Sequence, residues 1–318
     1  MVRRASRVGL ALVVGAAAVW LLWPERAPGP TGRWLARAGL APRFETIDGV
    51  RIRYVRGGAG EPVLLLHGFA SSIYTWSAVW SELARGHDLV ALDLPGFGAS
   101  DQPSDLSFSL YPRVVAGLLD RLHLERTALV GNSMGGALAL LLAATQPERV
   151  TRLVLIDAAA FDRGPSDRPW LVRAAASRSA VALLGRLPLR RTLVRVGLGQ
   201  VFFDRSLVTP EREDEYLAPL LRPGALESLA SLAASPGGDA VARALPRVAA
   251  PSLIVWGAED RWIPVEDAER LAAALRGSRK VVLPACGHLP QEERPAQLVR
   301  LLDGFLAPAD GFRYAATP

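Results

Sequence analysis

Residues 127–136 read T-A-L-V-G-N-S-M-G-G, and this stretch decides the fold. Thr127–Val130 has the length and apolar character of a buried strand, and the residues from Gly135 onward have a helical pattern. Between them lies a G-x-S-x-G turn, which begins at Gly131 and bends too sharply for larger residues. Such a turn holds the serine hydroxyl at a helix N-terminus, where free N–H groups favour negative charge. The stretch therefore predicts Ser133 as a catalytic nucleophile.

A serine hydroxyl becomes a good nucleophile only when a base accepts its proton, and histidine is the usual base. The chain has four histidines, His67, His87, His123 and His288. In folds built around this turn, the catalytic triad follows the chain order serine, acid, histidine. Only His288 follows Ser133, so we predict that His288 is the general base.

An acidic residue must orient this histidine and stabilise its charged form. Asp260 follows the apolar run Leu253–Trp256, and Asp157 follows the apolar run Leu153–Ile156. Both positions lie at the expected carboxyl end of a strand. We predict Asp260 as the acid, with Asp157 in reserve and the neighbouring Glu259 as the least favoured candidate.

The tetrahedral intermediate of acyl transfer needs two N–H donors, which together form an oxyanion hole. Met134 directly follows the nucleophile and is expected to supply one donor from its backbone. Phe69, in the loop after the apolar run Pro62–Leu66, is expected to supply the other. We expect His67, in the same loop, to be structural rather than catalytic.

The rest of the chain supports an α/β architecture. Apolar runs of strand length alternate with helical patterns, as expected of parallel strands covered by helices on both faces. The runs are 62–66, 89–92, 127–130, 153–156, 253–256 and 280–283, and the helical patterns are 76–85, 113–122, 135–145, 265–275 and 296–306. Asp48-Gly49 between two strand-like segments predicts a β-hairpin. Residues 161–247 lack a clear core strand, so we predict a helical cap over the carboxyl edge of the sheet.

Several motifs, in this order, resemble those of the α/β-hydrolase family over roughly residues 44–307. They are His67-Gly68-Phe69, Asp93-Leu94-Pro95-Gly96-Phe97-Gly98-Ala99-Ser100, the nucleophile turn, Gly257-Ala258-Glu259-Asp260 and Gly287-His288. The resemblance implies the α/β-hydrolase fold, with a mostly parallel sheet, helices on both faces and an inserted cap. Serine at the turn, rather than aspartate, argues against haloalkane dehalogenases and epoxide hydrolases. Similar turns occur in serine esterases, monoacylglycerol-lipase-like enzymes and carbon–carbon bond hydrolases of ring-fission products.

We predict hydrolysis of a carboxylic ester with an apolar or lipid-like acyl chain, through an acyl-enzyme. Trp170, Phe202, Phe203 and Trp262 are candidates for the substrate pocket. Carbon–carbon bond hydrolysis of a ring-fission product is the alternative, although those enzymes usually have a tryptophan after the catalytic histidine, where this chain has Leu289. A non-catalytic binding module with this fold is a third hypothesis, but such proteins usually lack a triad member.

The N-terminal residues predict a membrane segment. Residues 1–23 combine three arginines with an uncharged apolar run that begins at Val8, and Pro- and Gly-rich residues 24–43 resemble a linker. We expect a single-pass anchor with the catalytic domain outside the cytoplasm. A secretory signal that is cleaved is the alternative. The expected organisation is therefore membrane segment 1–23, linker 24–43, core 44–160, cap 161–247 and core 248–318.

The composition excludes several classes of function. Three N-terminal arginines account for half of the formal net charge of +6, so nucleic-acid binding is not expected. The single cysteine, Cys286, excludes an internal disulfide. The sequence has no phosphate-binding loop, dinucleotide fingerprint or cluster of metal ligands, so we expect no metal and no other cofactor. The expected partners are a small-molecule ester and a membrane, and the sequence predicts nothing about the oligomeric state.

Overall fold

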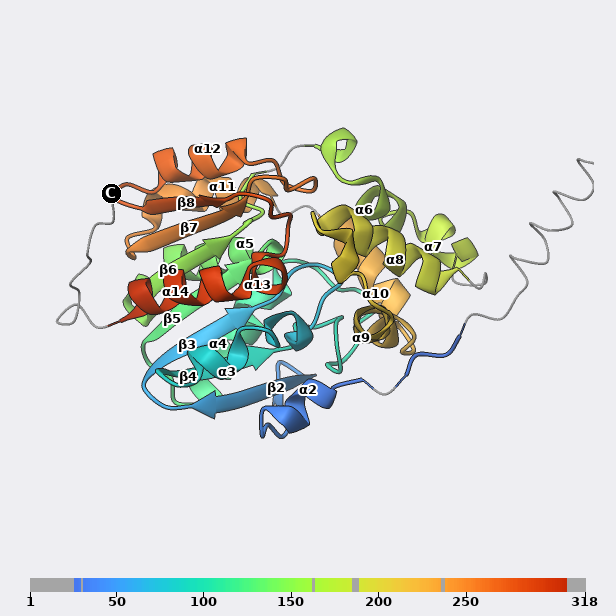
Figure 1. Ribbon diagram of the computed structural model, residues 1–318, viewed down its shortest axis with the longest axis horizontal. Coiled ribbons are helices and arrows are strands. Elements are labelled where there is room, and N and C mark those ends of the chain that lie inside the picture. The colour runs from blue at the N-terminus through green and yellow to red at the C-terminus, as the bar shows by residue number, and fades with distance from the viewer. Residues whose placement is uncertain (1–25, 30, 162–163, 185–188, 236–237, 308–318) are drawn as a thin grey trace, which may run out of the picture.

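The computed structural model describes residues 26–29, 31–161, 164–184, 189–235 and 238–307. Within these ranges, eight strands form one sheet in the order β1-β2-β4-β3-β5-β6-β7-β8 (Figure 1). The strands are β1 (Arg43–Ile47), β2 (Val50–Gly58), β3 (Glu61–Leu66), β4 (His87–Leu92), β5 (Thr127–Asn132), β6 (Val150–Ile156), β7 (Ser252–Gly257) and β8 (Arg279–Leu283). The pairs β1–β2 and β2–β4 are antiparallel, and the other pairs are parallel. The sheet is therefore mostly parallel, as predicted.

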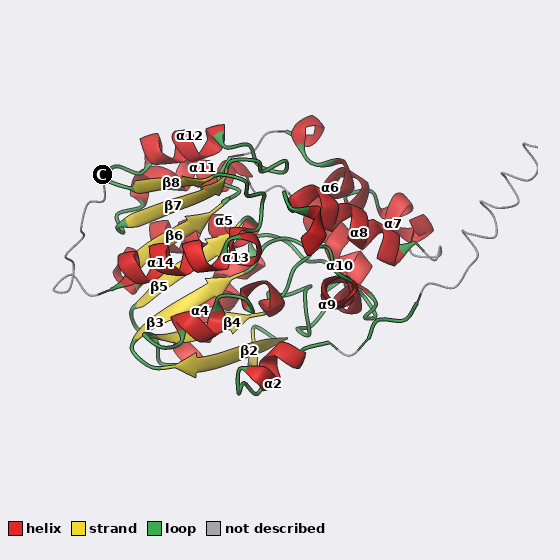
Figure 2. Cartoon of the chain, in the orientation of Figure 1, coloured by secondary structure: helices red, strands yellow, loops and turns green. Residues whose placement is uncertain are grey.

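Helices cover both faces of this sheet (Figure 2). One apolar core cluster includes residues of α4 (Leu110–Arg121), α5 (Met134–Thr145), α11 (Gly238–Ala244) and α12 (Glu266–Ala274). A second cluster, on the other face, includes residues of α2 (Arg33–Arg37), α3 (Trp80–Leu83) and α14 (Pro295–Leu306). Ten of the twelve residues of α5 are buried, which makes this helix the centre of the fold rather than a surface helix.

The hairpin between β1 and β2 has the turn that the sequence predicts. Ile47 pairs with Val50, so two residues connect the strands. Asp48 and Gly49 have φ angles of 50° and 78°. Positive φ at both central positions is typical of a type I′ turn, which matches the twist of the flanking strands.

Two elements differ from the sequence prediction. The helix expected over 76–85 is divided into a 3₁₀ turn, Ile73–Trp76, and the short helix α3. The strand β8 was expected to be covered on both faces, yet it is the last strand of the sheet and Val282 is 36% exposed. An apolar run alone does not reveal which strand lies at the edge.

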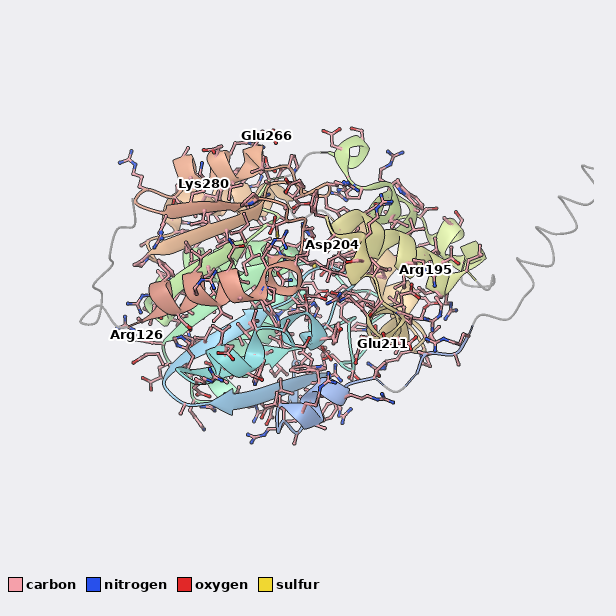
Figure 3. The ribbon with its side chains drawn as sticks, viewed as in Figure 1. Arg126, Arg195, Asp204, Glu211, Glu266 and Lys280 are labelled. Carbon is pink, nitrogen blue, oxygen red and sulfur yellow. The ribbon has the colours of Figure 1, made fainter. Side chains whose placement is uncertain are left out.

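The cap lies beyond the carboxyl ends of the parallel strands, between β6 and β7 (Figure 1). Its described helices are α6 (Trp170–Ala175), α7 (Arg178–Leu184), α8 (Arg190–Val201), α9 (Pro210–Leu220) and α10 (Ala225–Ala234). Figure 3 shows Arg195 and Glu211 on this side of the molecule. The helix α11 also falls in the predicted interval 161–247, but its Val241 belongs to the core cluster with α5. The helix α11 therefore packs on the core.

The predicted linker, residues 24–43, contains ordered structure. Trp34 and Leu35 of α2 are buried, and the Trp34 ring lies edge-on to the ring of Trp80, with 6.0 Å between centroids. Before α2, the chain is hydrogen-bonded to the cap helix α9. The N–H of Gly29 donates to Asp214 (2.9 Å), which also accepts from Arg26 (2.9 Å) and Arg191 (2.5 Å). Two apolar side chains and this carboxylate thus attach the described part of the predicted linker to the core and the cap.

No helix in the described part of the chain is long and apolar enough to cross a membrane. The expected membrane segment, residues 1–23, lies outside the described residues.

Candidate active site

Ser133 lies in a sharp turn between β5 and α5. Its φ and ψ angles are 56° and −118°, a conformation that non-glycine residues rarely adopt. A Cβ atom at Gly131 would lie 2.3 Å from the backbone oxygen of Gly135, and a Cβ atom at Gly135 would lie 2.1 Å from the backbone oxygen of Leu66. Only glycine fits at both positions, which explains the G-x-S-x-G pattern.

His288 and Asp260 are joined in the loops that follow β8 and β7. His288 Nδ1 lies 2.6 Å from Asp260 Oδ2, and both side chains are buried. The other oxygen of Asp260 accepts the N–H groups of Trp262 (2.7 Å) and Ile263 (3.0 Å). These donors fix the carboxylate, which in turn fixes the imidazole so that Nε2 is free to act as a base. Ser133 and His288 line the same cavity.

The two other candidate acids have different partners. Asp157 Oδ1 accepts the N–H of Gly257 (3.0 Å), and Glu259 accepts the N–H of Cys286 (2.8 Å). Neither carboxylate is hydrogen-bonded to His288 among the described residues. Asp260 is therefore the candidate acid that is hydrogen-bonded to His288.

The residues expected to form the oxyanion hole lie at the nucleophile. Met134 is the first residue of α5, so its N–H has no acceptor within the helix. Phe69 and Met134 line a cavity together with Ser133. These positions agree with the expected role of their backbone N–H groups.

His67 has a structural role beside the oxyanion hole. Its Nε2 accepts the N–H of Leu94 (3.0 Å), and its Nδ1 lies 2.8 Å from the oxygen of Gly68, to which it donates. Burial lowers the pKa of His67 and keeps the ring neutral. The ring thus ties the loop after β3 to the end of β4.

Two cavities reach Ser133 from the cap side. The first has a volume of about 200 Å³ and is lined mainly by aliphatic side chains, many of them from α8. The second, of about 220 Å³, has Arg168 and Asp167 in its wall. A catalytic serine between two cavities can bind the two parts of a substrate on either side of the bond that it cleaves.

Two of the four predicted pocket residues line these cavities. Trp170 and Trp262 do so, and the Trp262 ring also lies 5.6 Å from the His288 ring. Phe202 and Phe203 do not. Phe202 is fully buried in a cluster at the end of α8, and the guanidinium of Arg212 lies 4.9 Å from its ring. Phe203 follows the end of α8 and is 41% exposed.

The sequence analysis missed the aliphatic residues that line the first cavity. Val194, Leu198 and Val201 of α8 are buried and line it at intervals of four and three residues. This spacing places them on one helix face, so the pattern was present in the sequence. It did not show that this face lies over the serine rather than against the core.

Cys286 precedes the histidine loop but does not supply a second nucleophile. The thiol is buried, and burial together with the nearby carboxylates raises its pKa well above the usual range. Only the thiolate is strongly nucleophilic. Cys286 therefore acts as a small apolar residue.

The fold and this site define an enzyme of the hydrolase class. Residues 61–295 match the profile of the family described as the alpha/beta hydrolase fold, and the chain belongs to this family. The resemblance inferred from the five motifs is thereby confirmed.

Curated relatives are similar over most of the chain. A 2-hydroxymuconate semialdehyde hydrolase of Pseudomonas sp. (strain CF600) is 33% identical and is matched over 82% of this chain and 92% of its own length. A 2-hydroxy-6-oxo-2,4-heptadienoate hydrolase of Pseudomonas putida is 34% identical, over 80% of this chain and 91% of its own length. These relatives favour the alternative expectation, carbon–carbon bond hydrolysis, over ester hydrolysis.

Solved structures with the same fold include two kinds of hydrolase. A mutant of the meta-cleavage product hydrolase of Pseudomonas fluorescens IP01 superposes with a TM-score of 0.72 and 28% identity, and it covers 83% of this chain and 97% of its own. A membrane phospholipase A, described as a bacterial virulence factor, superposes with a TM-score of 0.67 and 28% identity, over 99% of this chain and 100% of its own.

The nucleophile is tested by the substitution Ser133→Ala in the full-length chain. A fluorophosphonate probe is expected to label the wild type and to leave the variant unlabelled, because the probe reacts with an activated serine hydroxyl. Mass spectrometry of the labelled peptide identifies the modified residue. Ser107→Ala, which changes a surface serine, is the matched control and keeps the labelling. Equal labelling of wild type and Ser133→Ala would refute the assignment.

Proposed function

We propose that this chain is a serine hydrolase that cleaves a bond to a carbonyl carbon carrying an apolar group. The observation that carries the proposal is the cavity at Ser133 and His288, whose wall is mainly aliphatic. An apolar group that enters this cavity gains about 25 cal/mol for each Å² that it removes from water. The carbonyl carbon attached to that group is then held beside the Ser133 hydroxyl.

Each catalytic group has a defined step in this mechanism. His288 accepts the proton of Ser133 as the oxygen attacks the carbonyl carbon, and Asp260 holds the imidazole through its Nδ1–H. The N–H groups of Phe69 and Met134 stabilise the oxyanion. As the intermediate collapses, His288 donates the proton to the leaving group, and water then hydrolyses the acyl-enzyme by the same route. A non-catalytic binding module would not need this complete set of triad residues and oxyanion-hole donors.

A carbon–carbon bond of a ring-fission product is the first candidate for the bond that is cleaved. The two curated relatives and the meta-cleavage product hydrolase support it. Substrates of this class have a ketone with one substituent on one side and a carboxylate-bearing dienol on the other. We place the substituent in the aliphatic cavity and the carboxylate-bearing part in the second cavity, which has Arg168 in its wall.

A carboxylic ester with a lipid-like acyl chain is the second candidate, and two observations favour it. The aliphatic cavity is lined on the cap side by Leu193, Val194, Leu198 and Val201, without an acidic side chain in its wall. The membrane phospholipase A also matches the chain over 99% of its length. Ester hydrolysis uses the same nucleophile, base and oxyanion hole as carbon–carbon bond hydrolysis. The two candidate reactions therefore differ in their leaving groups.

The two candidates are separated by their substrates. We expect 2-hydroxy-6-oxo-dienoates with alkyl or phenyl substituents on the ketone to lose their dienolate absorbance, with a higher kcat/KM than p-nitrophenyl esters or phospholipids. The measurement is a kcat/KM comparison over both series, with Ser133→Ala as the blank. Faster turnover of medium- or long-chain esters would establish the second candidate, and turnover of neither series would contradict the proposed function.

The aliphatic cavity is tested by changing its size. Gly197 lines it, and a Cβ atom there meets only the end of the Leu171 side chain, at 3.4 Å. Gly197→Leu therefore fills the cavity. We expect kcat/KM to fall at least about tenfold for substrates with the longest apolar substituent, and to fall less for substrates with an acetyl group. Gly199→Leu in the same helix is the matched control, because Gly199 does not line the cavity. Equal losses across all chain lengths would place the substituent elsewhere.

We also propose that residues 1–23 anchor the protein in a membrane, with the catalytic domain outside the cytoplasm. The basic flank, the apolar run and the similarity to a membrane phospholipase A support this proposal. Deletion of residues 1–23 is expected to move the protein from the membrane pellet to the soluble fraction, as measured by ultracentrifugation of lysates. An unchanged pellet fraction would contradict an anchor, and a mature N-terminus beginning after residue 18 would indicate a cleaved signal.

A further inference from the structure

Asp157 is a buried carboxyl group beside the triad that the proposed mechanism does not use. It follows β6, is 0% exposed and has a φ angle of 45°, in the left-handed region that aspartate rarely adopts. Its N–H donates to the oxygen of Val255 (3.0 Å), and its Oδ1 accepts the N–H of Gly257 (3.0 Å). Two residues of β7 thus hold Asp157 in place, and its carboxyl group lies near that of Asp260.

The two aspartates have different sets of donors. Asp260 accepts three N–H groups, from Trp262, Ile263 and His288. Asp157 accepts only one, and its Oδ2 meets no donor among the described residues. One oxygen of Asp157, one oxygen of Asp260 and one nitrogen of His288 all lie within 4.8 Å of one another. Two carboxylates this close in a buried site are not both ionised, and the one with more donors keeps the charge.

We propose that Asp157 is a positioning residue that holds a proton and donates it in a hydrogen bond to Asp260. The proton stays on Asp157 Oδ2, so that this oxygen gains an acceptor and Asp260 gains a fourth donor. No proton moves along this hydrogen bond during the reaction. The proposal rests on the proposed function, because it assigns a role within the same triad.

The surroundings of Asp157 favour its neutral form. Burial raises the pKa of Asp157 well above its usual range, and Asp260 raises it further through its charge and a hydrogen bond. Glu293 of α13 (Pro290–Glu293) adds a second negative charge, and the Cys286 thiol remains protonated. The helix α5 contributes no ionisable side chain. Among the described groups that face Asp157, His288 is the one that becomes a cation, and Asp260 already binds it.

The same three groups do not form a favourable metal site. His288 Nδ1 and Asp260 Oδ2 are 2.6 Å apart, which is a hydrogen-bond distance. Two ligands of a tetrahedral zinc ion, with bonds of about 2.0–2.1 Å, lie more than about 3 Å apart. A proton between these groups therefore fits the geometry better than an ion.

A neutral Asp157 would serve the triad in two ways. Its O–H gives the Asp260 carboxylate a donor in addition to the backbone N–H groups, which restricts the rotation of the carboxylate and thus of the imidazole. The same hydrogen bond stabilises the ionised form of Asp260, so that Asp260 orients the imidazolium without taking its proton. Asp157 touches neither the substrate nor Ser133 in this arrangement, and it acts through Asp260.

The test compares Asp157→Asn with Asp157→Leu in the full-length chain. Asparagine keeps an acceptor for Gly257 and an N–H donor for Asp260, whereas leucine has a similar size and neither group. The readout is the second-order rate of fluorophosphonate labelling of Ser133 as a function of pH, which reports the base and needs no knowledge of the substrate. We expect Asp157→Asn to keep the labelling rate within about threefold of the wild type and to leave the acidic limb of the pH–rate profile in place. We expect Asp157→Leu to lower the labelling rate at least about tenfold.

The outcomes separate the possible roles of Asp157. If Asp157 were ionised, Asp157→Asn would remove a negative charge near His288 and move the acidic limb to lower pH, which would overturn the proposal. Wild-type rates in both variants would also overturn it. If Asp157→Leu does not fold, as judged by circular dichroism, the pH profile of Asp157→Asn still decides. Failure of the proposed function is distinct from these results, because the wild type itself would then turn over neither substrate series or would not be labelled.

Discussion

The structure depends on the close backbone contact between α5 and the carboxyl end of β3. Gly135 lies so near the backbone of Leu66 that a single additional carbon would lie 2.1 Å from its oxygen. Gly136 has a similar contact with Ala158, where an added carbon would lie 2.6 Å from the Ala158 side chain. These contacts draw the start of α5 into the sheet and force Ser133 into its strained conformation. They also bring the loop after β3, with Phe69, to the nucleophile.

A second set of contacts joins the histidine loop to the cap. The N–H of His288 donates to the oxygen of Val201 (2.7 Å), at the last residue of α8. Glu293 accepts the N–H groups of Gly287 (2.7 Å) and Phe203 (2.8 Å), one from each side of this junction. Figure 3 shows Asp204, the residue after this junction, between the cap and the core. The cap therefore lines the cavity at Ser133 and also helps to position His288.

The sequence predicted which polar residues meet at the site better than it predicted the residues that line the cavities. Ser133, His288 and Asp260 could be chosen because chain order and position after an apolar run limited the candidates to a few. The same reasoning kept Asp157 in reserve behind Asp260, since both follow core strands, and it assigned Asp157 no role of its own. Phe202 and Phe203 were chosen as aromatic residues in the cap, and neither lines the two cavities described at Ser133. The direction of a side chain at a helix end depends on what packs against that end, which no local pattern records.

The amino-acid sequence alone determined the fold class, the nucleophile turn and the order of the catalytic residues, because glycine requirements and strand hydrophobicity act over short stretches of chain. The tertiary structure alone decided which acid binds His288, how near Asp157 lies to it and which face of α8 covers Ser133. Each of these depends on atoms that are far apart in the chain and close in space. Their distances follow from the packing of the whole sheet, its helices and its cap, so local sequence patterns do not contain them.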